Sequence, residues 1–327
     1  MDANRRKSNV ALLSVVSNSV LVVLKIVVGT LIGSVSVISE AIHSGVDLLA
    51  AIIALVAVRT SGKPADAEHP FGHGKVENIS GAIEAILIFV AAGWIAWEAI
   101  RKFLSPSEIE APGWGVAVMA VSAVANWIVS RMLFKVGKET GSMALQADGW
   151  HLRTDVWTSA GVMAGLAVIL LGDKFASHLG DRLHLIDPIA AMIVAALIVR
   201  AAWHLTVQTT HDLMDVQLPH DEEAWIRQII IAHQPDVRGY HRLRTRRAGP
   251  ARFIEFHMFV EGKMSVEESH RLAHDLASHA EEHFPGASVT IHVEPCRGDC
   301  RRQCSEGCFL TQQQRDAVRD RNAIKEQ

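Results

Sequence analysis

Residues 37–58 read VISEAIHSGVDLLAAIIALVAV, an apolar stretch that holds a histidine and an aspartate near its middle. Its second half, from Leu48 to Val58, is apolar on every side of a helix, whereas a helix on the surface of a soluble protein has one polar face. About 20 apolar residues cross the hydrocarbon core of a bilayer. The stretch is therefore predicted to be a transmembrane helix.

Five further stretches of similar length and character lie before about residue 210. With the first they are Val10–Leu31, Val37–Val58, Ile79–Ile100, Trp114–Leu133, Ser142–Leu171 and Ile186–Val207. Hydrophobic residues make up 49% of the 327 residues, which suits a protein that is largely embedded in lipid. The earliest stretch lacks a small-residue cleavage site and a second follows almost at once, so it is not a signal peptide. Residues 1–210 are predicted to form a bundle of six transmembrane helices.

Basic residues in the short loops predict the orientation of this bundle, because Lys and Arg accumulate on the cytoplasmic side. The N-terminus and the second and fourth loops carry Arg5, Arg6, Lys7, Arg59, Lys63, Lys75, Arg131, Lys135 and Lys138. The loops on the opposite side carry only Arg101, Lys102, Lys174 and Arg182. The protein is therefore expected in the cell inner (cytoplasmic) membrane with both termini in the cytoplasm.

The pattern changes after Pro219 to that of a small α+β domain. Amphipathic helices are predicted at 221–234 and 265–283, the second opened by a capping box of Ser265 and Glu268. Strands are predicted at 240–246, 252–261 and 288–294 from their alternation. The order α-β-β-α-β indicates a ferredoxin-like domain of the split-βαβ type over residues 211–295. Residues 296–327 read as a polar tail.

Charge and cysteine usage exclude two other classes of protein. The chain has 32 basic and 35 acidic residues, so it lacks the basic excess of a nucleic-acid-binding protein. All four cysteines lie in the tail, at Cys296, Cys300, Cys304 and Cys308, whereas a secreted disulfide scaffold spreads them through the fold. Four thiols suffice to bind Zn²⁺. The alternative is an idle or redox-reactive tail.

Two predicted spans contain the same pair of ionisable residues, written HxxxD. They are His43 with Asp47 in the second span and His151 with Asp155 in the fifth. A spacing of four places both side chains on one helix face, and ionisable groups at membrane depth cost roughly 2.5–3.5 kcal/mol each. Two such faces opposed offer two nitrogens and two oxygens, a tetrahedral set that suits Zn²⁺. The alternative is two hydrogen-bonded His–Asp couples that join helices.

Three local motifs, together with this quartet, resemble the cation diffusion facilitator family of metal/proton antiporters. They are Gly33-Ser34 through Asp47, Pro64-Ala65-Asp66 through Phe71-Gly72-His73-Gly74-Lys75, and Leu243-Arg244-Thr245-Arg246. The resemblance covers about residues 8–296. It implies a homodimer in which His43, Asp47, His151 and Asp155 form the transport site. The bacterial zinc and iron efflux members of the family carry Asp where His43 stands, and the His-Asp, His-Asp pattern is associated with zinc preference.

The resemblance also extends to the second loop. Asp66, His69 and His73 offer three ligands with an open fourth position, and in the family this loop can hold a second metal. The alternative is a turn in which His73 only forms hydrogen bonds. Lys75 resembles a family position that pairs with an acidic residue after the sixth span, for which Asp215 is the candidate. A solvated lysine is the alternative.

In the C-terminal domain the resemblance implies regulatory metals, bound partly across a dimer interface. The matching positions are His241, His257, His270 and His292, with Glu294 where an aspartate is common. Strand alternation places His257 on the face opposite Phe256 and Met258. His274, His279 and His283 read as surface histidines.

These features predict a secondary active transporter, a divalent metal/proton antiporter that exports Zn²⁺. Binding needs neutral histidines and ionised carboxylates, so metal entry expels protons. One alternative is a membrane-anchored metal sensor or scaffold. Another is an intramembrane zinc enzyme, but the chain contains no HExxH motif, which would supply both zinc ligands and a general base.

Overall fold

A computed structural model describes residues 3–32, 35–104, 114–175, 186–298 and 307–323. The chain divides into two compact units, Met1–Leu213 and Met214–Gln327. We describe each unit by itself.

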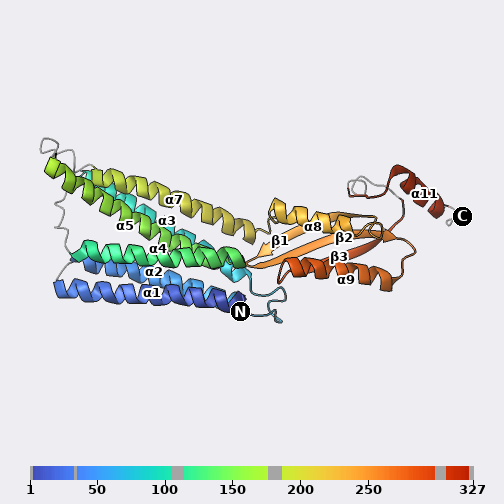
Figure 1. The fold of residues 1–327 in the computed structure, drawn as a ribbon, viewed down its shortest axis with the longest axis horizontal. Helices are drawn as coiled ribbons and strands as arrows, with labels where there is room; N and C mark the ends of the chain where they lie inside the picture. Colours follow the sequence, from blue (N-terminus) through green and yellow to red (C-terminus); the bar gives the residue numbers. More distant parts are fainter. Residues whose placement is uncertain (1–2, 33–34, 105–113, 176–185, 299–306, 324–327) are drawn as a thin grey trace. The chain divides into compact units, whose positions relative to one another are not determined.

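Within its described residues, the first unit contains six long helices, which run alongside one another in Figure 1. They are α1 (Ala3–Ile32), α2 (Val35–Ser61), α3 (Lys75–Leu104), α4 (Trp114–Thr140), α5 (Met143–Phe175) and α7 (Ile186–Leu213). Each predicted apolar stretch coincides with one of these helices. The helical bundle expected from the sequence is therefore confirmed.

Many large apolar side chains lie on the outside of this unit, and many alanines lie inside it. Val90, Trp94 and Trp97 are exposed, whereas Ala50 and Ala147 are completely buried. A soluble protein does not leave so much apolar surface in contact with water, and small residues let membrane helices approach closely. Among the described residues, five helices are long and apolar enough to cross a membrane; α5, which carries Asp148, Arg153 and Asp155 in its first half, is the sixth helix of the bundle.

Helix pairing brings the two HxxxD segments together. The most extensive contacts are between α3 and α7, α1 and α2, and α4 and α5, and α2 also packs against α5. Because His43 and Asp47 lie on α2 and His151 and Asp155 on α5, this last contact positions the four side chains within the bundle.

The second unit is a three-stranded sheet with two helices on one face, as Figure 1 shows. Its elements are α8 (His220–Ala232), β1 (Gly239–Ala248), β2 (Ala251–Glu261), α9 (Val266–His283) and β3 (Ser288–Cys296). Ile254, Phe256 and Met258 of β2 pack against Ile230 of α8 and Leu276 of α9. The predicted α-β-β-α-β order is confirmed, and so is the capping box of Ser265 and Glu268.

The strands lie in the order β1-β2-β3, with β1 and β2 antiparallel and β2 and β3 parallel. The β2-α9-β3 crossover therefore joins direct neighbours. The intervening strand expected for a split βαβ unit is absent from the described sheet, because the sequence provides only three strands here.

The described part of the C-terminal tail lies against β1. The backbone N–H of Tyr240 donates to the oxygen of Gly307 at 3.0 Å, and the N–H of Phe309 donates to the oxygen of Arg238 at 2.9 Å. Helix α11 (Gln312–Ala323) follows. These bonds cover part of the outer edge of β1, which would otherwise expose unpaired backbone groups.

Candidate functional site

Four side chains from α2 and α5 meet inside the bundle. His43 Nε2 lies 4.0 Å from Asp47 Oδ1 and 3.9 Å from Asp155 Oδ1, and His151 Nε2 lies 3.1 Å from Asp47 Oδ1. Ligand atoms of one tetrahedral zinc ion lie about 3.3 Å apart, because zinc–ligand bonds are about 2.0–2.1 Å long. His43, Asp47 and Asp155 offer ligand atoms that all lie within 4.8 Å of one another, and His151 joins this group through Asp47.

Burial of the quartet differs between its members. The side chains of Asp47 and His151 are only 4% and 5% exposed, whereas that of His43 is 47% exposed. Asp155 Oδ2 is buried and accepts no hydrogen bond from the described residues. A buried and a largely buried carboxylate, the second 15% exposed, attract a cation strongly where little water screens them, and His43 provides the accessible ligand.

A lysine stands next to this site on α1. Lys25 is 4% exposed, and its Nζ donates to Ser44 Oγ at 2.7 Å. Ser44 adjoins His43 in the sequence. The amine therefore holds the neighbouring turn of α2 in place. From its place in the first span, Lys25 would be expected only to extend its charged end toward the membrane surface.

Two further acids are buried inside the bundle, one on α5 and one on α3. They lie between the quartet and the ends at which α3 begins with Lys75 and α5 begins with Met143. Asp148 precedes His151 by three residues, and Glu84 lies on α3; both are completely buried. Neither acid belongs to the repeated HxxxD pattern by which the sequence identifies the quartet. The sequence indicates that Glu84 is unusual only because it is an acid within the apolar stretch 79–100.

The sequence analysis also missed a buried ion pair between α1 and α3. Lys7 Nζ lies 2.9 Å from Glu77 Oε1, and the two side chains are 2% and 0% exposed. The hydroxyls of Ser61 and Ser142 donate to the same carboxylate. Glu77 therefore connects the ends of several helices at one side of the bundle.

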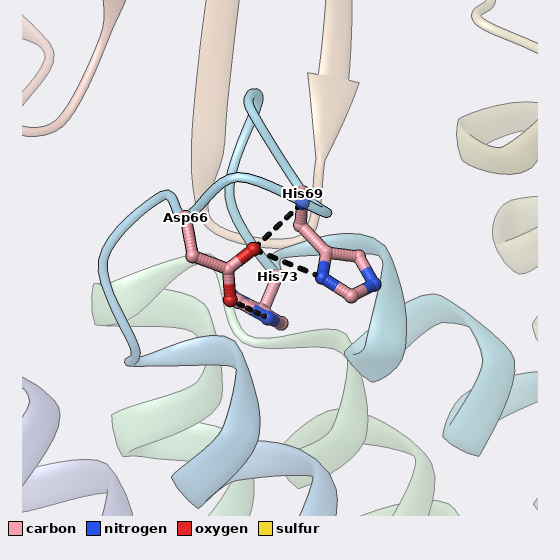
Figure 2. Close-up of side chains that lie close together, drawn as sticks. All are labelled: Asp66, His69 and His73. Carbon is pink, nitrogen blue, oxygen red and sulfur yellow. Dashed lines mark hydrogen bonds and ion pairs between the residues drawn. The ribbon is translucent and has the colours of Figure 1, made fainter.

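Asp66, His69 and His73 come together in the loop between α2 and α3, as Figure 2 shows. His69 Nδ1 lies 3.2 Å from Asp66 Oδ1, and His73 Nε2 lies 3.3 Å from Asp66 Oδ2. The backbone N–H of His69 also donates to Asp66 and lowers the pKa of that carboxyl. An ionised Asp66 between two imidazoles suits a divalent cation.

A second trio lies on the sheet of the C-terminal unit. His241, His257 and His292 are register neighbours across β1, β2 and β3. Glu294 joins them: its carboxylate oxygens lie 3.2 Å from His241 Nε2, 2.7 Å from His257 Nδ1 and 3.8 Å from His292 Nε2. Burial alone raises the pKa of Glu294, but the hydrogen bond from His257 and the neighbouring imidazoles lower it overall.

Other predicted site residues are not brought together within the described chain. His270 is exposed on α9 and lies outside the group formed by His241, His257 and Glu294. Asp215 contacts Arg246 at 3.5 Å, and its pairing with Lys75, which belongs to the other unit, stays a prediction.

The structure does not bring the two described cysteines together. Cys296 ends β3 and Cys308 forms a bridge with Gly239 at the start of β1, so that β1 and β2 lie between the two cysteines. Cys300 and Cys304 lie outside the described residues. The four-cysteine site stays a prediction.

Two family models match almost the whole chain. The cation efflux transmembrane domain matches residues 11–214, and the cytoplasmic domain of cation efflux proteins matches residues 218–296. The boundary between the two matches falls beside the boundary between the two compact units.

Relatives that match most of the chain are named as a transporter or as efflux pumps. An uncharacterized transporter of Synechocystis, sll1263, is 36% identical over 263 residues, covering 80% of this chain and 82% of its own. The cation-efflux pump FieF of Cronobacter sakazakii is 32% identical over 295 residues, covering 90% and 95%. Two solved structures of CzrB, one a zinc form, are 44% identical and cover 24% and 26% of this chain and 96% and 97% of their own, with TM-scores of 0.23 and 0.24.

Proposed function

Because the chain belongs to the cation diffusion facilitator family of cation efflux transporters, we propose that it exports Zn²⁺ in exchange for protons through His43, Asp47, His151 and Asp155. Efflux of divalent metal is the property of the family, and the chain is a transporter rather than an enzyme. The observation that carries the choice of site is that His43, Asp47 and Asp155 offer ligand atoms within 4.8 Å of one another, and that His151 lies 3.1 Å from Asp47.

Competition between metal and protons explains the coupling. Zinc binds neutral imidazole and ionised carboxylate, so each zinc that enters displaces any protons held by the four side chains. On the side where protons are plentiful, they reoccupy the ligands and release the metal. The site stays near the middle of the bundle while the helices tilt to open it to one side and then the other.

The surrounding organisation is part of the same proposal. We place residues 1–210 in the cell inner membrane with both termini in the cytoplasm, residues 211–295 in a cytoplasmic domain that mediates homodimerisation, and residues 296–327 in the tail. A family match to a domain named for the cytoplasm supports this orientation. Asp66, His69 and His73 are proposed to bind metal on its way to the quartet.

Metal flux into reconstituted vesicles tests the proposal. Zinc uptake should be faster when the acidic compartment is on the side toward which zinc moves, since protons drive release there. Equal uptake with and without a pH gradient would contradict proton exchange, and no uptake of any divalent metal would favour a sensor or scaffold.

His43 is expected to set selectivity more than activity. Substituting His43→Asp gives the site three carboxylates and one imidazole, and oxygen donors accept a wider range of divalent metals than imidazole does. The variant should transport Cd²⁺, Fe²⁺ or Mn²⁺ relative to Zn²⁺ better than the wild type in parallel flux assays. An unchanged order of metals would place selectivity outside this residue.

The trio on the sheet is expected to stabilise the C-terminal unit when it binds zinc. This unit has its own hydrophobic core, and a ligand that binds only the folded form adds stability as RT ln(1 + [L]/Kd). Zinc should raise the melting temperature and the dimer fraction of residues 214–327. The variant His257→Gln/His292→Gln should lose most of this gain.

The matched control is His220→Gln/His274→Gln, which removes two exposed histidines that lie outside the trio. It should keep the zinc response. The gain should also fall in acid, because protons compete with zinc for the imidazole nitrogens; the lowered pKa of Glu294 keeps its carboxylate ionised further into the acid range. A zinc response that is equal in both double variants would contradict the sensor role.

A further inference from the structure

Two histidines outside every cluster described above lie side by side on the helical layer of the C-terminal unit. His233 caps the end of α8, and His279 lies on α9, with their ring centroids 5.7 Å apart. The trio of His241, His257 and His292, with Glu294, lies on the other face of the sheet, because His257 alternates with the core residues Phe256 and Met258. The pair is therefore separate from that site.

Both imidazoles are held by the same kind of hydrogen bond. His233 Nδ1 lies 2.8 Å from the backbone oxygen of Ile229, and His279 Nδ1 lies 2.8 Å from the backbone oxygen of Asp275. A carbonyl oxygen only accepts, so each Nδ1 must carry the hydrogen. In the neutral ring the lone pair is then on Nε2, the arrangement in which a backbone carbonyl orients a metal-binding histidine.

The spacing of the rings also suits a shared ion. A zinc–nitrogen bond is about 2.1 Å long, so two imidazoles on one ion have centroids about 5.2 Å apart at the tetrahedral angle and about 6.4 Å apart at an angle of about 180°. The observed 5.7 Å lies between these two values. The distance between the rings therefore allows both to bind a common metal.

We propose that His233 and His279 form a metal site that clamps the end of α8 to α9. Two imidazoles select Zn²⁺, Ni²⁺ or Cu²⁺ over Mg²⁺ and Ca²⁺, which prefer oxygen ligands. Water completes the coordination shell. Since α8 and α9 cover the same face of the sheet, the clamp stabilises the helical layer whether or not the membrane quartet transports.

Chemical modification of individual histidines distinguishes zinc binding at this pair from zinc binding at the other clusters. Diethyl pyrocarbonate reacts with unprotonated imidazole nitrogen, and mass spectrometry of peptides reports each histidine separately. In the full-length protein in nanodiscs, Zn²⁺ at ten times its dissociation constant should slow the reaction of the exposed His279 about tenfold. Mg²⁺ at the same concentration should leave the rate unchanged.

The partner substitutions decide whether the two histidines share the ion. In His233→Gln, the reaction of His279 should become independent of zinc, and in the reciprocal His279→Gln the reaction of His233 should do so. The control His220→Gln removes another exposed histidine of α8 and should retain the protection. Protection of His279 that persists in His233→Gln, or equal rates with and without zinc in the wild type, would overturn the proposal.

Discussion

Replacing Asp47 or Asp155 by asparagine is expected to abolish zinc transport while leaving the protein folded in the membrane. Both carboxylates belong to the quartet between α2 and α5, and Asp47 is 3% exposed. Asparagine keeps the size of the side chain and removes its charge. A doubly charged ion in a low-dielectric interior then loses the anion that offsets its desolvation.

The loss should not be recovered by the remaining three ligands. Asp47 Oδ1 lies 3.1 Å from His151 Nε2 and 4.0 Å from His43 Nε2. Removing its charge therefore affects the approach of metal to both imidazoles. Binding and transport are expected to fail together, which distinguishes loss of the site from a defect in helix movement.

Zinc flux in vesicles and equilibrium zinc binding measure the two effects, and gel filtration checks folding. The control is Asp212→Asn on α7, a carboxylate that accepts a hydrogen bond from Asn78 at 2.9 Å and lies outside the quartet. The control should remain active. Near-normal flux in Asp47→Asn and Asp155→Asn would remove the quartet from the mechanism.

The sequence predicted the helices well because membrane spans have a strong local signal. An apolar stretch long enough to cross the bilayer forms a helix, because a helix satisfies all its backbone hydrogen bonds within the segment in lipid. The repeated HxxxD pattern predicted a meeting of α2 and α5 because two buried acids need a common cation or partner. The observed distances agree with that expectation.

Contacts between residues with no repeated pattern were not predictable in the same way. Glu84 is one acid in an apolar stretch, and nothing in the sequence shows that it is buried near Asp148 on another helix. His233 and His279 are 46 positions apart, and they meet only because α8 and α9 cover the same face of the sheet. The sequence identifies such residues as unusual only after the packing of the elements is known.

Lys7 and Glu77 illustrate the same limit and lead to a second large effect. The sequence suggests that Lys7 is one of several basic residues at the cytoplasmic end, whereas the structure buries it against Glu77. Substituting Glu77→Gln is expected to destabilise the membrane unit by about 3–5 kcal/mol, because it leaves the lysine charge buried without its partner.

Removing both charges should cost less than removing one. The variant Lys7→Met/Glu77→Gln leaves no buried charge, so it should recover much of the stability lost in Glu77→Gln. Unfolding in a graded series of denaturing detergent, followed by tryptophan fluorescence, measures this cycle. The hydroxyls of Ser61 and Ser142 donate to different oxygens of Glu77, and glutamine keeps one of these acceptors and replaces the other with an NH2 group. Because both variants carry Glu77→Gln, this change cancels when they are compared, and the difference between them isolates the buried lysine charge.

Arg6 and Glu139 provide the matched control. They form an ion pair at 2.7 Å between α1 and α4, but both side chains are 42% exposed. An exposed pair contributes about 0–1 kcal/mol, so Glu139→Gln should change stability little. If Glu77→Gln and Glu139→Gln unfold at the same detergent concentration, then water reaches Lys7 and the buried pair does not connect α1 to α3.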